Sequence, residues 1–391
     1  MMKGLFRQKG AQLDINILAS DEAQEFITTH AGILDGGFQK VEMSDKMRER
    51  LTRSNYIFSG IKTFHELNEA FPSMLDENGN KKPFERFLND VQKINDTYNA
   101  NYLHAEYNFV QASATMAAKW EQFSEDGDRY NLQYRTAKDD KVRPEHAALD
   151  GVTLPMSDSF WETYYPPNGW NCRCTVVQVR KQKYPATEHT EAMSRGEEAM
   201  NGERYNIFRF NSGKQGKTMP DYNPYTIRRC NDCDVAKGKL KLGFVPDYQL
   251  CQGCIMIRKC SEDRNRDNSA KATKKSPEVK KLQGTTISNP DFNHEVLVTG
   301  GSIREWTNQP HKEYAAKNSI LKHIAKVFRE ANYIGVVDNF KQKPGVIQSH
   351  LFETTVLGDV SWIVIREYDD GRFILHSLSD GDRIKTGIRK E

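Results

Sequence analysis

The chain has 391 residues, more than a single hydrophobic core normally organises, so we expect two or three domains. Its residues are 37% hydrophobic and 28% charged, and its formal net charge is +3. No run of eighteen apolar residues is present, which excludes a membrane-spanning helix, and the first residues lack the apolar stretch of a secretory signal. We therefore expect a protein that is made in the cytosol and has no membrane partner.

The first third of the sequence predicts helices. The segments Asp21–Thr28 and Ser44–Leu51 are amphipathic, and Ser44 is a good N-cap for the second. Residues 84–123 are the clearest helical block, because apolar side chains recur there every three or four positions. These are Phe84, Phe87, Leu88, Val91 and Ile94, then Tyr98, Tyr102, Ala105, Phe109, Ala112, Met116 and Trp120. The pattern predicts a long helix or a helical hairpin that buries one face in a core.

The segment from Tyr134 to Cys174 is rich in turn-forming residues and precedes a predicted strand, Thr175–Val179. It contains His146, Cys172 and Cys174, which are residue types that bind zinc. In one interpretation these three side chains hold a metal ion, with a nearby aspartate, Asp139 or Asp150, as a fourth ligand. Alternate residues of a regular strand lie about 6–7 Å apart, which is too far for both thiols to reach one ion unless a turn brings them together.

A second interpretation of the same segment is a structural clamp. Its arginines, Arg143 and Arg173, would pair with the carboxylates of Asp139, Glu145 and Asp150, while His146 caps a turn. A third interpretation makes Cys172 a nucleophile with His146 as its base, but no oxyanion-hole motif supports it. We favour the clamp over the metal site.

The clearest metal pattern lies further along the chain. Two Cys-x2-Cys pairs, seventeen residues apart, are formed by Cys230, Cys233, Cys251 and Cys254. This spacing is typical of a zinc-ribbon-like module, and four thiolates leave no open coordination position, so we expect a structural zinc ion. Redox-active cysteine pairs are the alternative, and Cys260 is left over.

The regions around this module differ in composition. We expect residues 181–225 to be a polar connector, 226–260 the zinc module and 261–285 a disordered basic linker. Residues 213–285 contain 16 Lys and Arg against 8 Asp and Glu. Such a basic region suggests contact with nucleic acid, and a solvated tether explains it equally well.

Residues 286–391 predict a compact α+β domain. We expect a strand at His294–Thr299, an amphipathic helix from Pro310 to Ala331, and then four strands. The strands are Tyr333–Val337, Ile347–Val356, Val360–Glu367 and Arg372–Leu378. Asp369-Asp370-Gly371 is a hairpin turn signal. The whole chain is therefore a multidomain α+β protein: a mainly helical N-terminal part, a zinc-ribbon-like module, and a helix packed on an antiparallel sheet.

An ordered set of residues resembles the phage Mu F-like minor head proteins, which are associated with the portal vertex of tailed-phage capsids. It runs through Arg135-Thr136, Asp139, Val142–His146, Asp150-Gly151, Pro155, Phe160-Trp161 and Pro166–Cys174. The resemblance covers roughly residues 90–180 within a head-protein region of 1–180. It implies portal and capsid partners, and a place in the virion, at the capsid interior or portal vertex, after a stay in the host cytoplasm.

The last hundred residues resemble the barnase/EndoU/colicin/RelE-like nuclease domains that such head proteins often carry. The resemblance rests on Val296–Thr299, Ile303-Arg304-Glu305, the helix from His311, Ala331–Gly335 and His350–Thr355. It implies metal-independent RNA cleavage, which needs an acid, a base and groups that stabilise phosphorane charge. We expect His350 or Glu353 as acid or base. The other candidates are His376, Thr355, Arg366 and His311.

Two functions follow from the sequence. The first is a phage or prophage minor head protein that carries a C-terminal ribonuclease-like toxin, with RNA as substrate and an immunity protein as a candidate partner. The second is a purely structural head-morphogenesis or DNA-packaging protein, whose C-terminal domain binds nucleic acid or a partner without catalysis. A regular strand would place His350 and Glu353 on opposite faces, so the two should not both face the active site.

Overall fold

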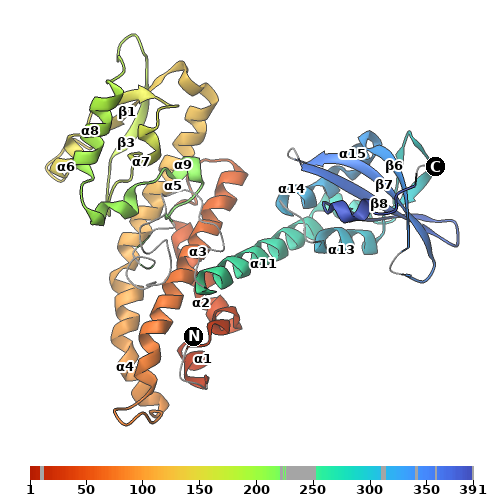
Figure 1. The fold of residues 1–391 in the computed structure, drawn as a ribbon, viewed down its shortest axis with the longest axis horizontal. Coiled ribbons are helices and arrows are strands. Elements are labelled where there is room, and N and C mark those ends of the chain that lie inside the picture. The colour runs from red at the N-terminus through yellow and green to blue at the C-terminus, as the bar shows by residue number, and fades with distance from the viewer. Residues whose placement is uncertain are drawn as a thin grey trace. The chain divides into compact units, whose positions relative to one another are not determined.

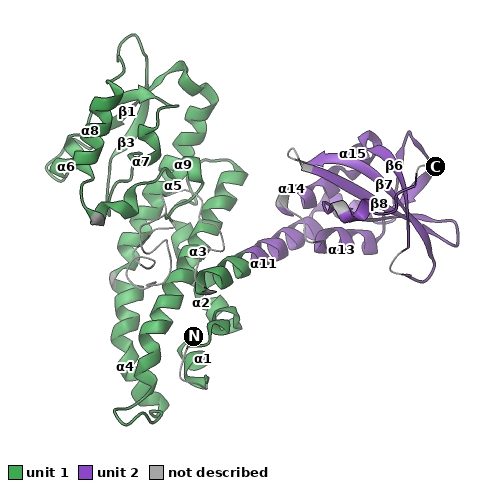
Figure 2. Ribbon diagram, viewed as in Figure 1, with its two compact units in different colours: residues 1–261 green, residues 262–391 purple. Residues whose placement is uncertain are grey.

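The computed structural model describes residues 1–8, 13–220, 223, 225, 252–309, 314–339, 342–356 and 359–389. They divide into two compact units, Met1–Ser261 and Glu262–Glu391 (Figure 2). Both helices and sheets are present, in agreement with a mixed α and β class. Across these described ranges, none of the helices has the length and apolarity needed to span a membrane.

The first unit begins with helices (Figure 1). In chain order they are α1 (Met2–Arg7), η1 (Ile15–Ala19), α2 (Asp21–Gly36), α3 (Asp45–Ala70), η2 (Phe71–Met74), α4 (Phe84–Asp96) and α5 (Leu103–Asp126). Ser44 caps α3 as expected, since its hydroxyl accepts from the Met47 amide. The predicted helical block is confirmed as α4 and α5, joined by the π-helical turn η3 (Thr97–Asn101).

A small sheet follows the helices, with strand order β2-β1-β3. Its antiparallel strands are β1 (Asn131–Arg135), β2 (Thr153–Pro155) and β3 (Thr175–Val179). The short helices α6 (Pro144–Ala147) and α7 (Phe160–Thr163) lie in the two connections. The strand predicted at 175–179 is confirmed, whereas the first two strands were not predicted because each is short and flanked by turn residues.

Residues 181–225 differ from the polar connector that we expected. They form α8 (His189–Ala199), η5 (Glu203–Phe208) and α9 (Ser212–Gln215). The ring of Phe208 lies 5.5 Å from that of Phe109, and Phe210 is also buried. A few apolar side chains in a polar sequence are therefore enough to dock this segment on the main core.

The expected disordered linker is also different in the structure. Residues 261–285 continue α11 (Gln252–Lys275), which is followed by α12 (Pro277–Leu282). Lys, Arg and Ala favour helix, and an ion pair between Arg266 and Asp263 adds local support. Buried residues such as Ala270 fix the helix, so sparse apolar content did not imply disorder here.

The second unit contains a six-stranded sheet of order β4-β5-β9-β8-β7-β6. Its strands are β4 (Thr286–Asn289), β5 (Phe292–Leu297), β6 (Asn332–Asp338), β7 (Val346–Val356), β8 (Asp359–Tyr368) and β9 (Phe373–Ser379). The four predicted strands of the meander are confirmed. The pairing of β5 with β9 is parallel, so the sheet is mixed and not purely antiparallel.

The core of the second unit lies between its helices and one face of the sheet. The helices are α13 (Gly300–Asn308), α14 (Tyr314–Ser319), η7 (Ile320–His323) and α15 (Ile324–Glu330). The single helix predicted at 310–331 is thus divided into shorter ones over its described part. Trp306 and Phe328 are buried with Phe352 of β7, whereas Leu351 belongs to a separate cluster with Val364 of β8.

Candidate functional site

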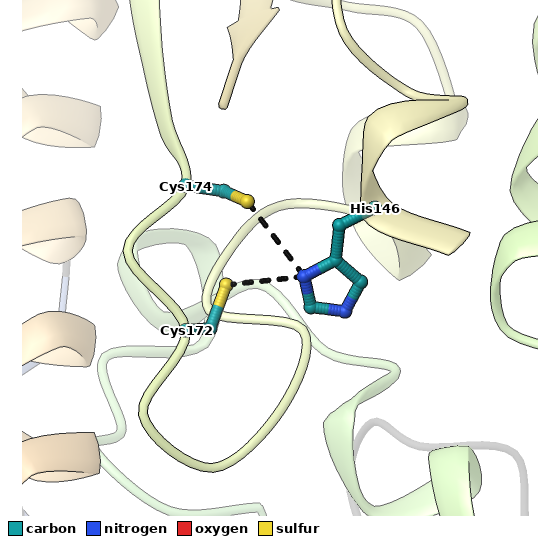
Figure 3. Close-up of side chains that lie close together, drawn as sticks. All are labelled: His146, Cys172 and Cys174. Carbon is teal, nitrogen blue, oxygen red and sulfur yellow. Dashed lines mark hydrogen bonds between the residues drawn. The ribbon is translucent and has the colours of Figure 1, made fainter. Parts of the chain in front are cut away.

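His146, Cys172 and Cys174 lie together in the first unit (Figure 3). His146 is on α6, which Pro144 begins, and both cysteines are in the loop before β3. Asn171 has a φ of 56°, so the chain turns sharply just before Cys172. Because the cysteines lie in a loop and not in a regular strand, the 6–7 Å separation of alternate strand residues does not apply to them. Both thiols can therefore reach one point.

The Nδ1 atom of His146 is the centre of this cluster. It lies 3.7 Å from the Sγ of Cys172 and 3.7 Å from the Sγ of Cys174. All three ligand atoms are within 4.8 Å of one another. His146 is only 2% exposed and Cys172 7%, and the Nε2 of His146 has no hydrogen-bond partner among the described residues.

The two thiols differ in their electrostatic state. A hydrogen bond from Cys174, together with His146, holds the pKa of Cys172 well below its usual range despite burial. The pKa of Cys174 is raised by its hydrogen bond with Cys172 and by burial. The arrangement therefore favours a thiolate at Cys172 and a proton on Cys174 when no ion is bound.

Tyr134 is a buried neighbour that the sequence reasoning did not include. Its hydroxyl donates to Oδ1 of Asn168 at 2.8 Å, and burial, with the two cysteines, raises its pKa well above the usual value. It lies on β1, where it is one of four buried residues in succession. The sequence alone does not indicate that Tyr134 lies beside the two cysteines, since a tyrosine on a strand is most often a core residue.

The charged residues around the cluster form only part of the expected clamp. Arg173 makes two hydrogen bonds to the carboxylate of Asp139, at 2.5 and 2.7 Å, and they lower the pKa of Asp139 to about 2. Arg143 donates instead to the backbone oxygen of Trp170 at 2.6 Å. The pair Arg173–Asp139 is confirmed, and the expected carboxylate partner of Arg143 is replaced by this carbonyl.

The other two acids of the expected clamp have different partners. Glu145 accepts from the Tyr205 hydroxyl at 2.7 Å and contacts Arg204, both outside the motif. Asp150 accepts from the backbone amide of Thr136 at 2.8 Å. The acids therefore brace the loops around the cluster, and none of them joins the histidine and the two thiols.

A cavity of about 20 Å³ opens beside the cluster. This is enough room for one water molecule or one ion. Its lining includes Lys141, Arg143, His146, Asn171, Cys172 and Cys174. The arrangement offers soft ligands, a buried setting and a small adjacent space.

The catalytic candidates of the second unit are not brought into one site. His350 is 3% exposed and points to the helix-covered face, whereas Glu353 shares the opposite face with Leu351. Thr355 and Arg366 lie on the face of Glu353, but Arg366 pairs with Ser349, well away from Thr355. His376 occupies the extra position where the register between β8 and β9 shifts.

The remaining predicted site residues have little or no structural description. His311, Cys230, Cys233 and Cys251 lie outside the described residues. Cys254 is described: it is buried on α11 within the core of the first unit. The zinc module therefore stays a prediction from the sequence.

Two segments of the chain match known protein families. Residues 77–177 match the family described as Phage Mu protein F like protein. This match ends just past Cys174 and includes the whole cluster. Residues 265–375 match Large polyvalent protein-associated domain 3, a description that says nothing of nuclease activity.

Two curated relatives make the likeness more specific. Over 284 residues the chain is 28% identical to the putative capsid assembly protein F of Escherichia phage Mu, covering 66% of this chain and 61% of that protein. Over 102 residues it is 32% identical to the Mu-like prophage FluMu F protein of Haemophilus influenzae, covering 26% and 22%. The chain thus spans about three fifths of the first relative and about a fifth of the second. No solved structure matches.

Proposed function

We propose that this chain is a head-assembly protein of a Mu-like phage or prophage. The observation that carries the proposal is the match of residues 77–177 to the Phage Mu F-like family, together with an alignment over 284 residues to a putative capsid assembly protein. Its partners would be capsid and portal proteins, and its final location the virion. The first unit, which contains the matched region, would supply the docking surface.

Particle purification tests this proposal. The gene is deleted from the phage or prophage, and the full chain is supplied in trans. We expect full heads only with the chain, and we expect the chain to copurify with capsid or portal protein through a density gradient. Normal heads from the deletion strain, or a chain found only in the unassembled fraction, would contradict the proposal.

For the second unit we propose binding without cleavage as the first function, and ribonuclease activity as the second candidate. The ribonuclease is supported by the order of a helical segment followed by an antiparallel meander, and by five candidate polar residues on its strands. The separation of His350 from Glu353 excludes these two residues as an acid–base pair at one phosphodiester, so a ribonuclease would need another partner for either of them. RNA, packaged DNA or a protein partner remain the candidate ligands.

Expression of the full chain in bacteria separates the two functions. A ribonuclease would arrest growth and cleave cellular RNA, and Glu353→Gln would relieve both effects. A binding domain would leave growth and RNA intact while retaining labelled RNA or DNA in a gel-shift assay. Cleavage that depends on Glu353 would overturn the preference for binding. An immunity protein is expected only if the second unit is a ribonuclease.

A further inference from the structure

We propose that His146, Cys172 and Cys174 bind one zinc ion, with a water molecule as the fourth ligand. The proposal is independent of the four-cysteine module, since Cys172 and Cys174 lie outside it. It is also independent of what the second unit does, because all three ligands belong to the first unit.

The distances carry the first part of the argument. In a tetrahedral zinc site the Zn–S distance is about 2.3 Å and the Zn–N distance about 2.0–2.1 Å, which separates sulfur from nitrogen by about 3.6 Å. Both thiols of this cluster lie 3.7 Å from the same nitrogen of His146. Both sulfur–nitrogen edges of a zinc tetrahedron are therefore already present, and the two sulfurs lie within 4.8 Å of each other.

Hydrogen bonds among the three side chains explain this geometry less completely than a bound zinc ion does. The Nδ1 atom of an imidazole makes one hydrogen bond, as donor or acceptor, so the two contacts of 3.7 Å with the thiols cannot both be hydrogen bonds at once. The second thiol then has only its hydrogen bond with the other cysteine. A metal ion uses all three atoms equally. Two thiolates, a neutral imidazole and a divalent cation also sum to zero charge, which suits ligands as buried as His146 and Cys172.

The cavity beside the cluster supplies the fourth position. Its volume of about 20 Å³ is suited to a single water molecule, and all three ligands line it. The charged side chains that line the cavity belong to Lys141, Arg143 and Arg173, so no carboxylate there supplies the fourth ligand. A soft donor set of two sulfurs and one nitrogen selects zinc over magnesium or calcium.

The position of the ligands in the fold indicates a structural role. His146 belongs to the connection between β1 and β2, and the cysteines belong to the connection between β2 and β3. One ion would therefore join the two long connections of the small sheet. Both are turn-rich, so a metal crosslink between them would add to the stability that buried side chains such as Leu149 and Trp161 provide.

Thiol protection in the unaltered full chain tests the proposal first. The chain is purified without chelator and treated with iodoacetamide, and the modified peptides are mapped by mass spectrometry. We expect Cys172 and Cys174 to react at least tenfold faster after a strong zinc chelator is added. Equal rates with and without the chelator would overturn the proposal, and would leave the cluster as a hydrogen-bonded clamp.

Metal content of variants tests the site directly. Zinc per full chain is measured by plasma mass spectrometry for the wild type, the double variant Cys172→Ser/Cys174→Ser and the control Cys260→Ser. We expect the double variant to lose one equivalent, and the control to lose none, whatever the other cysteines hold. An unchanged zinc content in the double variant would overturn the proposal.

Cobalt substitution separates loss of the site from loss of the fold. Cobalt(II) bound by thiolates has a charge-transfer absorption whose strength reports the number of sulfur ligands. The conservative variant Cys174→His keeps a ligand in place, so we expect a full equivalent of metal with a weaker sulfur band. The same absorption in Cys174→His and the wild type would show that Cys174 is not a ligand.

Discussion

His350 and Glu353, three residues apart on β7, project from opposite faces of the second sheet. His350 pairs with Ile365 and Glu353 with Trp362 across an unbroken register, so the alternation of the strand is regular between them. The Nε2–H of His350 donates to Glu367 at 3.1 Å, while the Tyr333 hydroxyl lies 3.0 Å from Nδ1. Both nitrogens of His350 are thus engaged within the second unit, and its ring lies 4.9 Å from that of Phe292.

Replacing the two residues should therefore affect stability very differently. His350→Ala removes a buried ring and its hydrogen bonds with Glu367 and Tyr333, so we expect a loss of about 2–4 kcal/mol in the free energy of unfolding. Glu353→Ala, at a half-exposed position, should change it by less than about 0.5 kcal/mol. Urea denaturation of the full chain measures both. Equal effects of the two substitutions would contradict the assigned faces.

A second prediction concerns the buried ion pair of the helical core. Lys62 Nζ lies 2.6 Å from Glu106 Oε2, and both residues are at most 3% exposed. Removing one charge leaves the other buried and uncompensated, so Lys62→Met should cost about 3–5 kcal/mol. The double variant Lys62→Met/Glu106→Leu should cost less than the sum of the two single changes. A thermodynamic cycle from urea denaturation measures this difference.

The control for this cycle is an exposed pair on α8, Arg195 and Glu191. Because solvent screens it, its removal by Arg195→Met should cost no more than about 0.5 kcal/mol. Strict additivity at Lys62 and Glu106 would show that the pair is not coupled in the folded chain.

The third prediction is a pH dependence caused by Glu66. Burial raises its pKa to about 7 from an ordinary 4.5, and the Asn99 side chain partly opposes the shift. The folded state therefore holds this proton more tightly than the unfolded chain, and the stabilisation is complete below about pH 4.5. This stabilisation is lost as the pH rises through about 7, and the free energy of unfolding falls by up to about 3 kcal/mol.

Glu66→Gln should remove this part of the pH dependence, since glutamine keeps the contact with Asn99 and has no proton to lose. We expect the melting temperature of the variant, relative to that of the wild type, to increase between pH 5 and pH 8 in matched buffers. The exposed Glu85→Gln of α4 serves as the control. A constant difference between Glu66→Gln and wild type across this range would contradict the prediction.

The fourth prediction uses two glycines in different surroundings. A Cβ at Gly213 would lie 2.1 Å from the Trp120 Cβ, so α9 can dock on α5 only with glycine there. Gly213→Ala should destabilise the first unit by about 1–3 kcal/mol. A Cβ at Gly32, within α2, meets nothing within 4 Å, so Gly32→Ala should stabilise by about 0.5–1 kcal/mol. Thermal melting compares them, and the opposite signs are the diagnostic result.

The glycine-rich segment around Gly213 also shows how the sequence was informative. Its Gly-Lys-x-Gly-Lys-Thr order superficially resembles a phosphate loop, but it lacks the required spacing and a preceding strand. The structure gives Gly213 a packing role against Trp120 instead. The local pattern excluded a phosphate-binding loop, but it did not predict the packing of Gly213 against Trp120.

Local periodicity predicted the elements that depend on local patterns. Apolar spacing predicted α4 and α5, and alternation with an Asp-Gly turn predicted β7, β8 and β9. Ser44 was predicted as a cap because a cap needs only its own side chain and an amide three residues on. These features have short range, so a stretch of sequence contains the information they require.

Long-range pairing was beyond such patterns. The parallel contact of β5 with β9 joins residues almost eighty positions apart, and the docking of residues 181–220 depends on a few aromatic side chains. The cluster is the clearest case. The sequence by itself determined which ligands were available, His146, Cys172 and Cys174, but only the tertiary structure put both sulfurs 3.7 Å from one nitrogen. A bend before Cys172 and the packing of α6 decide that distance, and neither is encoded by residue type or spacing alone.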